Sequence, residues 1–168
     1  FTSFAFATGP ASVYRVRVTK VRLWNGASWV SVYDGLSTAL DIASVGAGVS
    51  AGNFLTGLVV PDGTYTKVEV TPSANFTYSG HDGVNYTTAV AGPGGGRVPG
   101  GVGAEAEYTV TLPIAPGADV QDFSATPITV VDGGADHKVR ISFDVANAID
   151  ASSGEVWPAQ PTVTMSIQ

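Results

Sequence analysis

Apolar and polar side chains alternate along most of this 168-residue chain. The alternation is clearest in the segments at residues 13–24, 106–112, 139–145 and 162–167. A period of two puts successive side chains on opposite faces of a strand, so that one face of each segment meets a core. Glycine and proline (21 and 10 residues) interrupt the pattern too often for long helices. The sequence therefore predicts an all-β protein, a single antiparallel β-sandwich of the transthyretin or immunoglobulin type.

Turn signals and phase changes locate the connections between the predicted strands. Asn25-Gly26 separates the alternating segments 13–24 and 29–33 and predicts a hairpin between them. The apolar phase shifts after Val18, which predicts a bulge near Thr19–Lys20. Further strands are predicted at residues 64–71, from Phe76, at 84–88 and at 128–131.

Two segments depart from this pattern. Residues 36–58 are the least strand-like, and we expect a short helix or an irregular arm there, because Gly46, Gly48 and Gly52 oppose a long helix. Residues 91–104 are dominated by glycine and predict a flexible connection of fourteen residues, either functional or mobile.

Charge excludes several classes of partner. The chain has eight basic and fourteen acidic residues, a net charge of −6. This balance argues against a nucleic-acid binder, which needs clustered Lys and Arg, and against adhesion to an anionic membrane surface. No apolar run approaches the ~18 residues of a spanning helix, so no membrane span is expected.

The composition also bears on the compartment. The chain has no cysteine, which excludes disulfides, thiolate metal sites and a cysteine nucleophile. Its low charge and its many Thr, Ser and Gly residues are typical of an exported protein, and we predict a secreted or cell-surface location. The start at Phe1 predicts a removed signal peptide or a trimmed chain. Two N-x-[ST] sequons make Asn75 and Asn85 glycosylation candidates.

Few residues suit catalysis. His81 and His137 each adjoin an aspartate, but neighbours on a strand or turn point apart, so we expect turn formers and no enzyme. Aspartates at 119–122 and 132–136 lie in predicted loops without EF-hand spacing, so no metal site is expected. The segment 91–104 has neither the following helix nor the lysine of a phosphate loop, and no cofactor is predicted.

Several segments, taken in their order along the chain, resemble the domain of unknown function 4382 family. Members of this family are secreted β-sandwich domains of bacteria and archaea. The matching segments are 16–23, 29–32, 40–42, 60–68, 139–145 and 157–161. The resemblance implies a transthyretin- or immunoglobulin-like sandwich outside the cell, with no catalytic residues. In order, these segments cover nearly the whole chain from residue 13 onward and leave residues 1–12 outside, so we expect a sandwich domain at 13–168 and an N-terminal extension at 1–12.

The extension carries the sharpest functional hypothesis. Residues 1–8 are predicted to form an uncharged strand with Phe1, Phe4 and Phe6, and we expect Gly9-Pro10 to follow as a hinge. Such a strand can fill a groove in a neighbouring copy, and because the contact is heterologous it builds an open filament. We therefore predict a structural subunit of a surface homopolymer. The alternative for residues 1–8 is the first strand of their own sandwich.

The second reading is a secreted carbohydrate-binding or adhesion module that acts as a monomer on surface glycans. Five aromatic residues are candidates for stacking on sugar rings: Trp24, Trp29, Tyr33, Tyr78 and Tyr86. We expect most of them in the core, because a sandwich commonly buries such residues.

Overall fold

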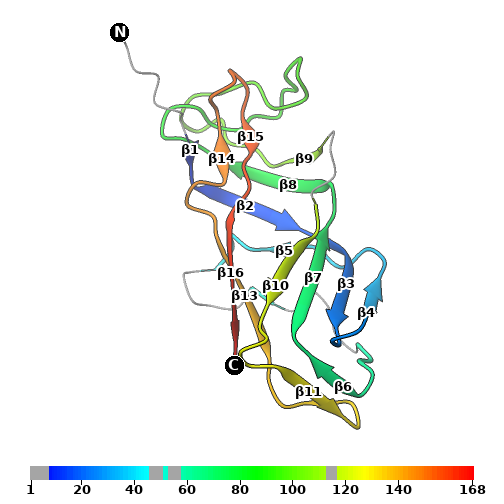
Figure 1. Ribbon diagram of the computed structural model, residues 1–168. Coiled ribbons are helices and arrows are strands. Elements are labelled where there is room, and N and C mark those ends of the chain that lie inside the picture. The colour runs from blue at the N-terminus through cyan, green and yellow to red at the C-terminus, as the bar shows by residue number, and fades with distance from the viewer. Residues whose placement is uncertain (1–7, 46–50, 53–57, 113–116) are drawn as a thin grey trace.

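The computed structural model describes residues 8–45, 51–52, 58–112 and 117–168. Within these residues all regular secondary structure is β-strand. The strands form several antiparallel sheets of two to four strands each. The prediction of an all-β protein is confirmed, and the sheets are layered as in a β-sandwich (Figure 1).

The first large sheet contains the centre of the core. Its strands, in the order β5-β2-β8-β9, are β5 (Leu40–Asp41), β2 (Ala11–Val16), β8 (Asn75–Gly80) and β9 (Tyr108–Thr111). Their alternate side chains Tyr14, Val16, Phe76 and Tyr78 are buried together, as the period of two predicts. The Tyr78 hydroxyl donates a 2.7 Å hydrogen bond to the Val156 carbonyl, which satisfies the polar end of a fully buried ring.

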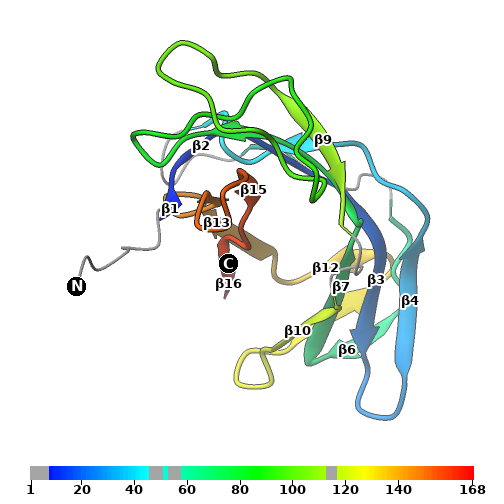
Figure 2. The same cartoon turned by 90° about the horizontal axis from the view of Figure 1, so that it is seen from above.

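The second large sheet continues from the first. Its strands, in the order β10-β7-β3-β4, are β10 (Asp119–Asp122), β7 (Lys67–Pro72), β3 (Val18–Trp24) and β4 (Trp29–Asp34). Only Arg17 separates β2 from β3, so one length of chain bends from one sheet into the next. Figure 2 shows the resulting curved wall, with β13, β15 and β16 inside the curve.

Two local predictions for this sheet are confirmed. Asn25-Gly26 lies in the β3–β4 hairpin, where Trp24 pairs with Trp29 and Gly26 takes a φ of 93°. The Asn25 side-chain oxygen accepts hydrogen bonds from the main-chain N–H groups of the two residues before Trp29. The pairing of β3 with β7 shifts register between Val18 and Lys20, at the predicted bulge.

A two-stranded sheet forms the opposing layer. It pairs β13 (Val139–Asp144) with β16 (Thr162–Ile167). Phe143 packs on the core of the first large sheet, whereas Val139 and Ile167 pack on a second core around Tyr65 and Ile128. The layer therefore spans both large sheets with only two strands in the described residues.

Two small sheets close the ends of the molecule. At one end lie β6 (Gly63–Tyr65), β11 (Ile128–Val131) and β12 (Gly134–Ala135). At the other end lie β1 (Thr8–Gly9), β14 (Ile149–Asp150) and β15 (Trp157–Pro158). The N-terminal end of the described chain thus joins the sheet that is farthest from β11 (Figure 1).

Some expected elements differ. The strand expected at 84–88 is absent, because the Asp82 carboxylate caps a turn by accepting hydrogen bonds from the N–H groups of Val84 and Asn85. The strand expected at 64–71 is split at Thr66, whose N–H and carbonyl bond to other segments. Within 36–58 the described residues hold only the short strand β5 and no helix, and residues 46–50 and 53–57 lie outside the described chain.

The glycine-rich segment 91–104 has a defined shape, contrary to the expected flexible connection. Arg97 is buried within it and exchanges main-chain hydrogen bonds with Val156. The Glu155 carboxylate accepts hydrogen bonds from the N–H groups of Gly94 and Gly96. Contacts with a segment about sixty residues further along the chain therefore fix this loop.

Candidate functional site

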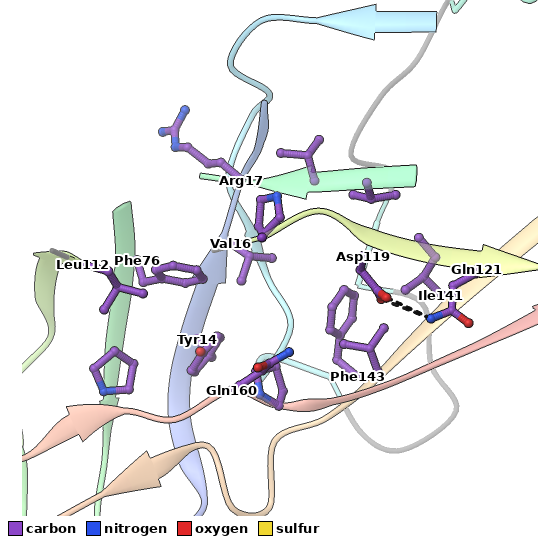
Figure 3. Close-up of a pocket in the computed structure, with 17 residues that line it drawn as sticks. Tyr14, Val16, Arg17, Phe76, Leu112, Asp119, Gln121, Ile141, Phe143 and Gln160 are labelled. Atoms are coloured by element: carbon purple, nitrogen blue, oxygen red, sulfur yellow. Dashed lines mark hydrogen bonds between the residues drawn. The ribbon is translucent and has the colours of Figure 1, made fainter. Parts of the chain in front are cut away.

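An apolar groove of about 320 Å³ lies between the β13–β16 pair and the curved wall of the large sheets. Protein interiors seldom contain voids much larger than a water molecule, so a space of this size is a gap in the packing of the sandwich. It lies at the small end of the usual range of ligand pockets, roughly 300–1,000 Å³. Figure 3 shows that the side chains around it come from both layers.

The base of the groove is made by the bend between the two large sheets. Tyr14, Val16 and Val18 line it because alternate residues of β2 and β3 point to the interior. Phe76 of β8 lies beside Tyr14, with 6.0 Å between the ring centroids. The Tyr14 hydroxyl donates a 2.9 Å hydrogen bond to the Ala159 carbonyl, and burial raises the pKa of Tyr14 above its usual value. This surface offers aromatic and branched aliphatic contact.

One side of the groove is the edge strand β10, whose polar side chains face the groove while its apolar side chain faces solvent. Asp119 and Gln121 line the groove, whereas Val120 between them points outward and is 47% exposed. The Gln121 amide nitrogen lies 3.1 and 3.2 Å from the two Asp119 carboxylate oxygens, so the pair satisfies itself (Figure 3). Asp119 is itself exposed, so this pair lies at the rim of the groove, and charged groups on an edge strand are one way in which proteins discourage random edge pairing.

The other side is built by the opposing layer. Ile141 and Phe143 of β13 and Val163 of β16 face the groove, and Pro158 and Pro161 line it next to them. Strands β10 and β16 are both edge strands, each with a single partner among the strands of the described residues. An edge strand presents a row of unpaired main-chain groups. The groove therefore combines apolar contact surface with two strand edges, which is the arrangement that accepts an extended peptide.

The predicted interface residues divide into two groups. Phe1, Phe4 and Phe6 lie outside the described residues. Gly9 is buried in β1, where Thr8 and Gly9 pair with Asp150 and Ile149 of β14.

Gly9 and Pro10 do not have the features of a free hinge. A Cβ atom at Gly9 would overlap the His81 carbonyl oxygen, so glycine is needed there for close packing. The exposed Pro10 follows and accepts a long, 3.4 Å hydrogen bond from the His81 N–H. The chain is therefore held by its own domain from Thr8 onward, and any segment that leaves the domain precedes Thr8.

The two sequons differ in accessibility. Asn75 is exposed at the start of β8, and its side-chain oxygen accepts a hydrogen bond from the Thr111 hydroxyl. Asn85 is half-buried, and its amide nitrogen donates a 2.8 Å hydrogen bond to Asp82. Asn75 therefore offers the more accessible acceptor.

The aromatic candidates lie mostly outside the core, contrary to expectation. Only Tyr78 is fully buried, whereas Trp24 and Trp29 lie half-buried on the outer face of the β3–β4 hairpin. Their ring centroids are 5.5 Å apart at 60°, and the Arg22 guanidinium lies 5.4 Å from the Trp29 ring. Arg22 also makes two 2.7 Å hydrogen bonds to the Glu69 carboxylate. The pair belongs to an amphipathic outer surface.

The histidines and loop aspartates take part in local structure. The His81 ring stacks on Tyr86 at 4.5 Å and accepts a hydrogen bond from the Gly83 N–H. His137 lies 3.0 Å from the Asp136 carboxylate, so the expectation that these neighbours point apart is wrong for this pair. The nearby His137 ring, together with a 2.7 Å hydrogen bond from the Thr129 N–H, lowers the pKa of Asp136. Among the described residues, no three His, Cys, Asp or Glu side chains are grouped as metal ligands are.

Comparisons of this chain with family models, curated proteins and solved structures gave no match. The resemblance to the domain of unknown function 4382 family stays a prediction. Within the described ranges, no helix is long and apolar enough to cross a membrane.

Sequence reasoning did not find the groove. Its base residues were expected in the core, where they lie, but the gap above them depends on the opposing layer, which has only two strands in the described part of the chain. The one local signal was the reversed pattern at 119–122, where polar residues alternate with Val120. Read as a strand, this pattern indicates an edge whose inner face is not closed by apolar packing.

Proposed function

We propose that this protein is a non-enzymatic structural subunit that polymerises into an extracellular, cell-surface filament. In each junction, residues 1–7 of one copy, which precede β1 and include most of the predicted strand 1–8, occupy the groove of the next copy. The observation that carries the proposal is the groove itself, an apolar channel bordered by the edge strands β10 and β16. An added strand supplies both the missing side chains and the main-chain partners.

The sequence of the N-terminal segment suits this groove. Phe4 and Phe6 are two residues apart, so in an extended strand they share one face about 6.6 Å apart. Burying each ring contributes about 1.5–3 kcal/mol. The segment has no charged side chain, so it brings no unpaired charge into the apolar channel and no repulsion from Asp119.

The geometry of the exchange favours an open polymer. The strand leaves from β1 beside β14, whereas the groove lies between β10 and the β13–β16 pair, so donor and acceptor are different surfaces. Contacts between unlike surfaces are heterologous, and they continue as a filament unless the rotation closes a ring. A low-charge, Thr- and Ser-rich chain suits side-by-side packing of many copies outside the cell.

The test is the double substitution Phe4→Asp with Phe6→Asp. Two carboxylates cannot enter the apolar channel without a large desolvation cost, so we expect a folded monomer and no filaments by negative-stain electron microscopy. The matched control is Phe4→Leu with Phe6→Leu, which keeps apolar burial and should still assemble. Normal filaments from the aspartate variant would refute strand insertion.

A second candidate function is supported by the Trp24–Trp29 pair. Half-buried tryptophans on an outer face, beside charged and hydrogen-bonding groups, offer the aromatic surface that a carbohydrate-binding or adhesion module needs for surface glycans. This candidate predicts a monomer that binds soluble glycans and loses that binding on Trp24→Ala with the fold intact. Filaments from the unsubstituted chain with no glycan retention would favour the first proposal.

A further inference from the structure

We infer that residues 83–104, here called the end loop, form a second contact surface between neighbouring copies of this chain. The inference rests on the proposed strand exchange and specifies which face of the donor copy meets the acceptor. Three independent features of the end loop support it: its surface chemistry, its fixed shape and its place beside β1.

The end loop has no exposed charged side chain of its own and exposes several valines. Among residues 83–104 the only charged side chain is Arg97, which is 2% exposed. Four of the large hydrophobic residues that the described chain exposes lie in this loop: Val84, Val90, Val98 and Val102. Val90 and Val98 adjoin each other, because the Val98 N–H donates a 3.0 Å hydrogen bond to the Val90 carbonyl. Exposed apolar side chains grouped in this way are typical of an interaction site rather than of a free surface.

The end loop also has a fixed shape. The Arg97 guanidinium lies 3.4 Å from the Tyr108 ring centroid, and its Nε donates a 2.8 Å hydrogen bond to the Thr88 carbonyl. Glu155 accepts hydrogen bonds of 2.7 and 2.8 Å from Gly94 and Gly96. A Cβ at Gly96 would overlap the Trp157 ring, so glycine permits close packing here. A preorganised loop loses little entropy on binding, which favours contact.

The end loop lies beside the point where the donor strand leaves the domain. Gly9 of β1 packs against the main chain of His81, which directly precedes the Asp82 turn into the loop. Figures 1 and 2 show β1 and these loops at the same end of the molecule. Seven residues before Thr8 span at most about 25 Å. A copy that holds them in its groove must therefore lie against this end.

Charge identifies a second copy as the occupant. Each chain carries a net charge of −6, so two copies repel unless they meet through surfaces without exposed charge. The end loop is such a surface, and the exchanged strand already brings a copy to it. Within residues 83–104, an acidic or basic partner protein would find no exposed side chain of opposite charge.

The test compares exposed valines of matched exposure. The end-loop variant carries Val90→Glu and Val102→Glu, at positions 60% and 85% exposed. The control carries Val131→Glu and Val59→Glu, at positions 61% and 86% exposed. Val131 is the last residue of β11 and Val59 precedes β6 by four residues, and Figure 1 shows both strands at the other end of the molecule. All four positions are exposed, so both proteins should fold, which circular dichroism checks.

The readout is the protein concentration at which light scattering first detects polymer. We expect the end-loop variant to need at least tenfold more protein, while the control changes the threshold less than twofold. Equal thresholds for the two variants, with normal polymer from the unsubstituted chain, would overturn the contact surface and leave strand exchange standing. No polymer from the unsubstituted chain at any concentration would overturn both.

Discussion

Filling the groove from within its own subunit should stabilise the monomer and block assembly. Val163 is half-buried on β16, lines the groove and pairs across the sheet with Phe143. Val163→Phe adds four carbon atoms that point into a space of about 320 Å³. Because that space is open, the overpacking cost of about 1–3 kcal/mol that such a change brings in a filled core does not apply.

The two effects have opposite signs and can be estimated. If half of the added carbons are buried, at about 0.8 kcal/mol each, the monomer gains roughly 1.5 kcal/mol. For a chain of this size that gain raises the Tm by about 3–6 °C. The inserted strand loses the room for one phenylalanine, about 1.5–3 kcal/mol, which weakens each junction roughly 10- to 150-fold.

Calorimetry of the monomer and light scattering of the polymerising sample measure these two quantities separately. The control is Val59→Phe, which adds the same atoms at an exposed position outside the groove lining and should change neither quantity much. A lower Tm for Val163→Phe would mean that the space is already filled in solution. A higher Tm with unchanged assembly would mean that the groove is not the acceptor. Either result refutes the reasoning.

Three further changes test other parts of the structure. Gly9→Ala puts a Cβ onto the His81 carbonyl and should separate β1 from β14, costing about 1–3 kcal/mol in urea unfolding. Hydrogen bonds from Ser124 and the nearby Lys67 lower the pKa of Asp122 to about 2. Its stabilising contribution is therefore present above the unfolded pKa of about 3.9 and is lost as pH falls through 2, so Asp122→Asn should flatten the acid decline of Tm. Glu155→Gln removes the carboxylate that holds Gly94 and Gly96, and hydrogen exchange at those two amides should accelerate while β8 amides stay protected.

The sequence predicted the parts of the fold that depend on neighbouring residues. The alternation of Tyr14, Val16 and Val18 placed them on one buried face, because strand geometry alone decides which side chains share a face. The hairpin at Asn25-Gly26 and the bulge after Val18 followed from local turn chemistry and from a phase change. The transthyretin- or immunoglobulin-like type of sandwich stays a prediction.

Features that depend on distant contacts could not be predicted in this way. The glycines of the end loop indicated flexibility, but Glu155 and Trp157, some sixty residues away in sequence, occupy the space that side chains would need. Most of the five candidate aromatic residues were expected in the core because a sandwich commonly buries such residues, yet the register of β3 turns Leu23 inward and therefore Trp24 outward. The groove depends on the number of strands in the opposing layer, which no local pattern encodes.

The most direct test of strand exchange is a disulfide between two copies, because the unsubstituted chain has no cysteine and any bridge identifies its own partners. One population carries Phe4→Cys, the other Val163→Cys, and the two are mixed before mild oxidation and mass spectrometry. Strand exchange predicts a bridge between the two populations, at a yield far above that of a control mixture in which Val59→Cys replaces Val163→Cys. If a chain that carries both substitutions closes its bridge within a monomer while the mixture yields no more than the control, residues 1–7 belong to their own domain and the account is wrong.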